Sequence, residues 1–156
     1  QAIEDRIAQV TQEAYDNGNY IFVAMDRHDE GDTFHPETKL FPPHNIAGTD
    51  GRELYGKLAG VYDAIKDDNR VFWMDKRHYS AFSGTDLDIR LRERRVTTVV
   101  LTGVLTDICV LHTAIDAYNL GYDIEVVESA TASLTPEAHD FAIGHLKNVL
   151  GATIVE

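Results

Sequence analysis

Residues 97–119 read TTVVLTGVLTDICVLHTAIDAYN, an apolar strand pattern that passes directly into a helical pattern. Cys109 is the only cysteine among the 156 residues, and it falls in the first turn of a helix that we expect over residues 107–119. Free backbone N–H groups and the positive end of the helix dipole favour a thiolate at such a position. Cys109 is therefore a candidate nucleophile, although a lone cysteine in an apolar segment is also compatible with a small buried hydrophobic residue.

The same alternation of strand and helix runs along the whole chain. We expect helices over residues 3–14, 52–65, 86–94, 107–119 and 136–150, and strands over residues 20–25, 71–74, 97–105, 122–127 and 152–155. The strands are continuous apolar runs, which predicts a doubly wound α/β fold, a parallel sheet with helices on both faces. We expect residues 1–156 to form a single domain of three layers, helices, sheet and helices.

The composition excludes several classes of partner. The chain carries 26 acidic and 14 basic residues, a formal net charge of −12, and its sequence pI is about 4.8. Such a surface repels nucleic acid and anionic membranes, and no apolar run is long enough to span a bilayer. A single cysteine excludes an internal disulfide, which fits a cytoplasmic location.

Reactive side chains follow three of the expected strands. Asp26 and His28 come after the strand at 20–25, Lys76 after the strand at 71–74, and Cys109 after the strand at 97–105. Sites in parallel α/β folds lie at the carboxyl ends of the strands, so these distant segments are predicted to meet at one edge. The loop over residues 27–50 is long for a compact domain, which is typical of functional loops.

The first of these segments has the chemistry of a metal site. Asp26 and His28 are two residues apart and can both face one ion, and the loop can add a further ligand. A carboxylate together with imidazole suits zinc, iron or manganese. An Asp-x-His pair is weak evidence by itself, because charged loop residues are usually only solvated.

The other segments are open to two interpretations each. Lys76 is either a surface charge or a cation that stabilises an ionised neighbour. Tyr79 fits either a core position or a pocket wall. We interpret His112, three residues after Cys109, as a buried and hydrogen-bonded helix residue, because a general base is normally brought from a separate element.

Four motifs together resemble the nicotinamidase branch of the isochorismatase-like cysteine hydrolases. They are DxH at residues 26–28, FPPH at 41–44 followed by GTxG at 48–51, KxxYSAFxGT at 76–85, and GVxTDICV at 103–110. They occur in the order that the family has and cover most of the chain. The resemblance implies the doubly wound isochorismatase-like fold.

The resemblance also implies roles for the reacting groups. Cys109 would attack the carboxamide carbon, and Lys76 would hold the ionised catalytic groups. The backbone N–H groups of Leu105 and Cys109 would form the oxyanion hole. The Val104–Leu105 peptide matches a position that is cis in the family.

Metal binding and substrate binding are implied in the same way. Asp26, His28 and His44 would bind one divalent metal ion, and Glu37 would join them as in relatives with a His-Pro-Glu loop. Zinc is the first expectation, with iron or manganese as alternatives, and His35 is left out of the set. The metal holds the pyridine nitrogen in the family, and the aromatic walls for the ring would be Phe41 and Tyr79.

The implied activity is the deamidation of nicotinamide to nicotinic acid and ammonia through a thioester, a step of NAD salvage, and pyrazinamide would also be cleaved. The substrate is a small molecule, and relatives suggest a homo-oligomer. Within the same fold, an isochorismatase or another amide hydrolase is one alternative, and the His44 motif argues against the isochorismatase members. A non-catalytic metal-binding module is the other alternative.

One part of the family pattern is absent from this chain. The family's general base is an aspartate on the first strand, whereas this chain opens at the helix that follows that strand. That strand is central in the family's sheet, and without it interior strand edges would be unpaired. We therefore expect about thirty further residues before Gln1, the length of a strand and its loop. Without them we expect an inactive and poorly stable protein.

Overall fold

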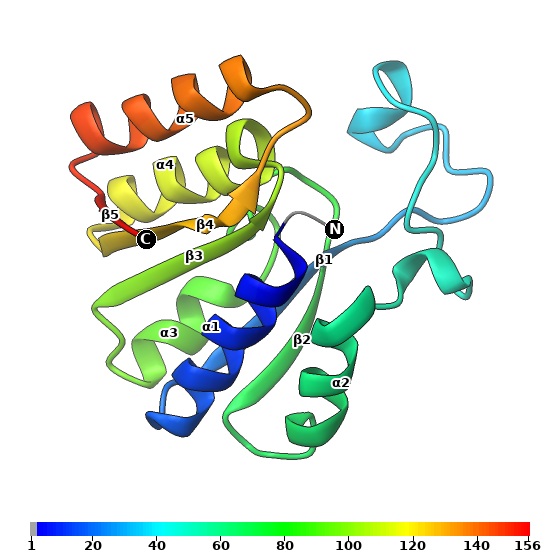
Figure 1. The fold of residues 1–156 in the computed structure, drawn as a ribbon. Coiled ribbons are helices and arrows are strands. Elements are labelled where there is room, and N and C mark those ends of the chain that lie inside the picture. Colours follow the sequence, from blue (N-terminus) through cyan, green and yellow to red (C-terminus); the bar gives the residue numbers. More distant parts are fainter. Residues whose placement is uncertain (1–2) are drawn as a thin grey trace.

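A computed structural model describes residues 3–156 (Figure 1). The helices are α1 (Glu4–Asp16), α2 (Gly56–Ile65), α3 (Leu87–Glu93), α4 (Leu111–Leu120) and α5 (Pro136–Asn148). The strands are β1 (Ile21–Asp26), β2 (Val71–Lys76), β3 (Thr98–Val104), β4 (Asp123–Ala132) and β5 (Thr153–Val155). Three short helical turns complete the description, η1 (Pro36–Lys39), η2 (Asp50–Arg52) and the π-helical turn η3 (Thr106–Val110). The predicted alternation of strand and helix is confirmed.

All strand pairs are parallel, as predicted, but the pairs fall into two groups. β1 pairs with β2 in a register that ends at Asp26 opposite Lys76. β3, β4 and β5 form the second group in that order. Within residues 3–156 no ladder joins β1 to β3, so the parallel strands form two sheets with unpaired edges between them, and the predicted doubly wound α/β fold class is confirmed.

Helices cover both faces of the strands, which gives the expected three layers. α1 packs against α2 and also touches β1 and β4, so it spans the two strand groups (Figure 1). Buried residues of α3, α4 and α5 share one apolar cluster with β2 and β4. The members at its centre are the side chains that are fully buried, Ala114, Ala117, Val126, Ala142 and Leu146. Burial of this cluster fixes the positions of α3, α4 and α5 against the strands.

Two element boundaries differ from the expectation for reasons that lie near the site. The helix expected from residue 52 begins at Gly56. Arg52 lies in η2 instead, and its side chain hydrogen-bonds to Asp26 in β1 and Asp75 in β2. The strand expected to end at residue 127 continues to Ala132, where it follows the end of β3. The register shifts between Leu101 and Gly103, and Gly103 has a φ of +114°, a conformation that favours glycine.

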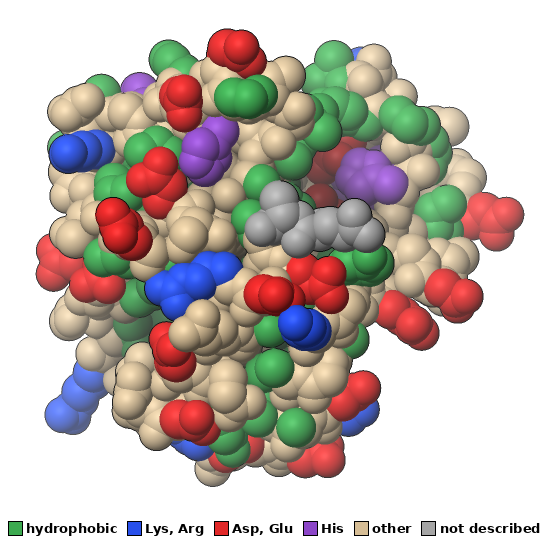
Figure 2. All heavy atoms as spheres, in the orientation of Figure 1, with side chains coloured by type: hydrophobic (Ala, Val, Ile, Leu, Met, Phe, Trp, Pro, Cys, Tyr) green, Lys and Arg blue, Asp and Glu red, His purple; other side chains and the backbone are tan. Residues whose placement is uncertain are grey.

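The surface agrees with the negative net charge. Acidic side chains are spread over the face drawn in Figure 2, with fewer basic ones among them. No helix within the described part of the chain is both long and apolar enough to cross a membrane.

Candidate active site

The ends of β1, β2 and β3 bring Asp26, Lys76 and Cys109 together, as the fold rule predicts. The Lys76 ammonium is buried and contacts the carboxylate of Asp26. It also donates to the main-chain oxygen of His78 at 3.0 Å and lies 3.6 Å from Cys109 Sγ. Asp26 and Lys76 are opposite each other in the β1–β2 register, so strand pairing places them side by side. A buried cation thus lies between a carboxylate and the thiol.

Cys109 lies in the π-helical turn η3, which is held by a cap at its start and by a side-chain hydrogen bond to α5. Leu105 caps the turn, and the Val104–Leu105 peptide is cis, as predicted. Thr106 Oγ1 lies 2.9 Å from Nδ1 of His139, a residue of α5. π-helical turns are rare and occur frequently at functional sites. The expected helical turn at Cys109 is therefore confirmed, and its geometry is π rather than α.

The ionisation of Cys109 differs from the expectation. Burial raises the pKa of the thiol, and the nearby carboxylates of Asp26 and Glu37 raise it further. Lys76 lowers it, by charge and by hydrogen bonding, without compensating fully. The helix-end argument alone, which predicts a favoured thiolate, is therefore wrong for these surroundings, because desolvation outweighs it.

A second cluster lies beside Asp26 and consists of imidazole and carboxylate groups. One ligand atom from each of His28, Glu37 and His44 lies within 4.8 Å of the others. Glu37 Oε2 is 3.6 Å from His28 Nε2 and 3.3 Å from His44 Nε2. Asp26 Oδ2 lies 3.8 Å from His44 Nε2. The four residues named as metal ligands are thus brought together, with Asp26 at the rim of the cluster.

The cluster has unsatisfied groups that fit a cation. His28 Nε2 and Glu37 Oε1 are buried and have no hydrogen-bond partner among residues 3–156. Buried polar atoms without partners are rare in folded proteins, and two imidazoles with carboxylates are a ligand set that suits zinc and related ions. The donor set present here therefore fits a divalent metal ion.

His35 belongs to this region, although the sequence analysis leaves it out. It is buried, its ring stacks on His28 with centroids 3.8 Å apart, and its Nδ1 accepts from the backbone N–H of Glu37 at 3.2 Å. His35 is the N-cap of η1, and Pro36 follows at the first position of that turn. Proline at this position is a known start signal, and it could have indicated that His35 caps a turn carrying Glu37.

Tyr79 and Phe41 are the two aromatic residues predicted to line the substrate site. Burial raises the pKa of Tyr79, and the negative charges of Glu37, Cys109 and Asp26 raise it further. Phe41 is half-buried and its backbone N–H donates to the Glu37 carbonyl at 2.8 Å.

The structure corrects the expected surroundings of His112. It bonds to the Ile108 carbonyl at 2.7 Å, as expected, but it is exposed rather than buried. Its ring lies 5.2 Å from that of Tyr79. The core side of α4 is taken by Leu111, Ala114 and Ala117, so His112 points the other way.

The chain is similar to a known protein family over nearly its whole length. The family model of the isochorismatase domain matches residues 1–155. A pyrazinamidase/nicotinamidase structure from Streptococcus mutans UA159 is 78% identical with a TM-score of 0.98, over 99% of this chain and 86% of that one. The nicotinamidase/pyrazinamidase PncA structure from Bacillus subtilis is 52% identical with a TM-score of 0.98, over 99% and 85% of the two chains.

A more distant structure bears on the metal. The pyrazinamidase of Pyrococcus horikoshii in complex with zinc is 27% identical with a TM-score of 0.84, over 99% of this chain and 84% of that chain. Since the family model covers nearly all of the sequence, the chain belongs to the isochorismatase family.

Proposed function

We propose that the protein is a nicotinamidase that hydrolyses nicotinamide to nicotinic acid and ammonia, and that it also cleaves pyrazinamide. The observation that carries the proposal is the position of Lys76, between the Asp26 carboxylate and Cys109 Sγ and next to the histidine–carboxylate cluster. A cysteine hydrolase for a ring-bearing amide needs these parts together, a thiol, a buried cation and a group that orients the ring. Similarity to the Streptococcus mutans and Bacillus subtilis enzymes supports the substrate class.

The metal in this proposal is one divalent ion, zinc by preference, held by Asp26, His28, Glu37 and His44. When bound, it would hold the pyridine nitrogen and so orient the ring. The unpartnered atoms of His28 and Glu37 and the zinc complex of the Pyrococcus horikoshii relative support this assignment. Phe41 and Tyr79 would form the aromatic walls on either side of the ring.

In the first half of the reaction, Cys109 Sγ gives its proton to a general base and attacks the carboxamide carbon. The carbonyl oxygen becomes an oxyanion that accepts hydrogen bonds from the backbone N–H groups of Leu105 and Cys109. Lys76 stabilises the negative charge that the sulfur carries once its proton has been taken, and it also pairs with the Asp26 carboxylate. The base returns the proton to the amide nitrogen, the C–N bond breaks, and ammonia leaves a thioester on Cys109.

In the second half, a water molecule gives a proton to the base and adds to the thioester carbon. The C–S bond breaks, the acid leaves, and the Cys109 thiol is regenerated. Lys76 is the side chain among residues 3–156 that hydrogen-bonds to Cys109 Sγ, and a lysine ammonium cannot accept the proton. The base in this proposal is an aspartate, an assignment that rests on the family resemblance alone.

Two further assignments complete the proposal. A cytoplasmic location fits the single cysteine, which excludes a disulfide within the chain. Assembly into a homo-oligomer stays a prediction that rests on relatives alone.

Ammonia release from nicotinamide tests the proposed activity, with the native-length protein loaded with zinc. Cys109→Ser serves as the matched variant, because it keeps the shape of the side chain and replaces sulfur by a weaker nucleophile. We expect release by the wild type and a loss of at least about a thousandfold in the variant. Equal rates for the two proteins, or no release by the folded and metal-loaded wild type, would overturn the proposal.

A further inference from the structure

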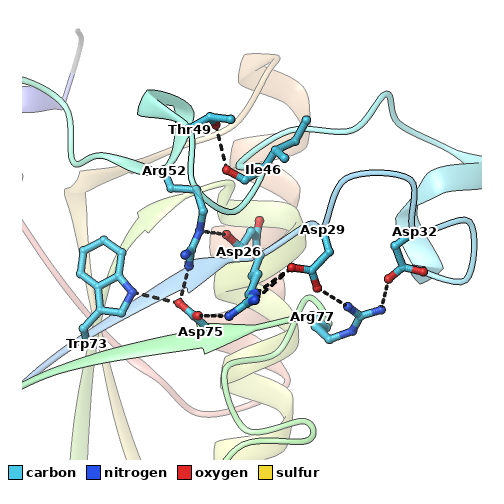
Figure 3. Close-up of polar contacts among 10 residues, drawn as sticks. Asp26, Asp29, Asp32, Ile46, Thr49, Arg52, Trp73, Asp75 and Arg77 are labelled. Atoms are coloured by element: carbon cyan, nitrogen blue, oxygen red, sulfur yellow. Dashed lines mark hydrogen bonds and ion pairs between the residues drawn. The ribbon is translucent and has the colours of Figure 1, made fainter.

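A network of ion pairs joins the ends of β1 and β2 outside the cluster described above (Figure 3). Its centre is Asp75, which directly precedes Lys76 in β2. Successive strand residues point to opposite faces, so Asp75 faces away from the thiol while Lys76 faces it. Asp75 Oδ1 accepts from the Arg52 guanidinium and from Trp73 Nε1 at 2.9 Å, and Oδ2 accepts from Arg27 Nη1 at 3.1 Å.

Arg52 bonds to both strands from outside them. Its Nε donates to the main-chain oxygen of Asp26 at 3.3 Å, while its Nη2 pairs with Asp75. The β1–β2 ladder ends at the pair of Asp26 and Lys76, so Arg52 binds the chain where the ladder stops. The Arg52 side chain is only 16% exposed, and its guanidinium carbon lies 5.9 Å from the centre of the Trp73 ring.

The segment before Arg52 is also hydrogen-bonded to the ligand loop, the loop that carries His28, Glu37 and His44. The N–H of Ala47 donates to the His28 carbonyl at 2.8 Å. Thr49 Oγ1 donates to the Ile46 carbonyl at 2.8 Å (Figure 3). Arg52 therefore joins three points, the end of β1, the end of β2 and the segment that closes the loop containing His28, Glu37 and His44.

We propose that Arg52 is a positioning residue for the metal site, because it holds the main chain of Asp26 against β2 and so sets how the Asp26 carboxylate faces the imidazoles. The inference rests on the proposed function, since it takes Asp26, His28, Glu37 and His44 as the ligands. A planar guanidinium can donate to a carbonyl and a carboxylate at once, whereas the ammonium of lysine is a compact charge on a flexible stem. Arg52 can therefore bind the Asp26 carbonyl and the Asp75 carboxylate together in a fixed geometry, which a lysine at the same position cannot.

Zinc affinity of the metal-free, native-length protein is the measurement, with a chromogenic chelator as competitor. We expect Arg52→Lys to bind zinc about tenfold to a hundredfold more weakly than wild type, the range found when residues behind metal ligands are changed. Asp75→Asn keeps the shape of its side chain but weakens its hold on Arg52, and it is expected to change affinity in the same direction. Excess zinc is expected to restore nicotinamide hydrolysis in both variants.

Arg70→Lys is the matched control. Arg70 precedes the other end of β2, pairs with Asp68 at 3.2 Å and lies over the ring of Tyr15, so it loses a comparable ion pair far from the ligands. We expect it to lower the unfolding midpoint in urea without changing zinc affinity. Zinc affinity that is unchanged in Arg52→Lys and Asp75→Asn, or equally weakened in Arg70→Lys, would overturn the positioning role and leave the proposed function standing. A folded wild type that binds no zinc would overturn the metal site and this inference with it.

Discussion

The two halves of the site are held in place by different forces. The turn that carries Cys109 continues into α4, whose buried side chains Leu111 and Ala114 belong to the apolar cluster shared with α3 and α5. The loop over residues 27–52 is tied mainly by ion pairs and buried imidazoles, and it leaves the side chains of Phe34 and Leu40 exposed. Apolar burial responds little to salt, whereas ion pairs weaken as salt rises.

This difference separates the tasks of the two halves. The nucleophile lies on an element whose position is set by the core. The ligand loop is held by charges, so its order is expected to depend on metal and on ionic conditions. Lys76 is the contact between them, because its ammonium touches both Asp26 and Cys109.

The largest effect is expected where the two halves meet. Lys76→Met removes the cation and leaves the thiol facing carboxylates, so we expect kcat/KM for nicotinamide to fall by about a hundredfold to a thousandfold. Ammonia release measures the change. Lys66→Met, which removes an exposed lysine paired with Asp63, is the control and should keep wild-type activity. A Lys76→Met protein as active as the control would show that the halves do not depend on this contact.

Next in size is a change confined to the apolar half. Leu146 in α5 is fully buried, and Leu146→Ala is expected to lower the free energy of unfolding by about 2–5 kcal/mol. Urea unfolding measures the loss, and the exposed Val149 provides the control variant Val149→Ala. Zinc affinity of the folded variant should stay at the wild-type value. A loss of zinc affinity would mean that the core also sets the loop.

A smaller effect is expected from the side-chain anchor of the Cys109 turn. Thr106→Val removes the partner of His139 Nδ1, and loss of this hydrogen bond to a half-buried imidazole is expected to cost about 0.5–1.5 kcal/mol. Thr153→Val, at an exposed position of β5, is the control. Urea unfolding of both variants measures the difference. Equal midpoints for the two would contradict an anchoring role for the bond between Thr106 and His139.

The smallest effect is expected from acid on the charged half. Burial would raise the pKa of Asp75, but hydrogen bonds from Arg52, Trp73 and Arg27 bring it below its ordinary value. A carboxylate with a lowered folded pKa contributes stability above its unfolded pKa and loses it as pH falls through the folded value. We therefore expect the wild type to lose its stability advantage over Asp75→Asn between neutral pH and about pH 3.

Thermal melting at several pH values checks this expectation. The advantage of the wild type at neutral pH should be about 2 °C, and it should shrink in 1 M salt, where the Debye length is about 3 Å. If the wild type still melted at a higher temperature than Asp75→Asn in acid, Asp75 would stabilise the protein by packing and not by its charge.

Sequence alone was sufficient for the features that local chemistry controls. Apolar runs and helical spacing predict parallel strands with helices on both faces, because backbone geometry fixes their periods. The rule that strand ends share an edge brings Asp26, Lys76 and Cys109 together, and the motif resemblance places His28, Glu37 and His44 beside them. The cis peptide at Val104–Leu105 was predicted from the same resemblance and is confirmed.

Tertiary structure decided what depends on groups distant in the sequence. Arg52 fits a helical pattern, yet it lies outside α2 because Asp26 and Asp75 are there to bind it. The raised pKa of Cys109 comes from burial and from carboxylates on other elements, neither of which the helix-end pattern contains. His35 could not be placed on His28 without the path of the loop. Periodicity is a property of neighbours along the chain, whereas burial and ion pairing are properties of neighbours in space.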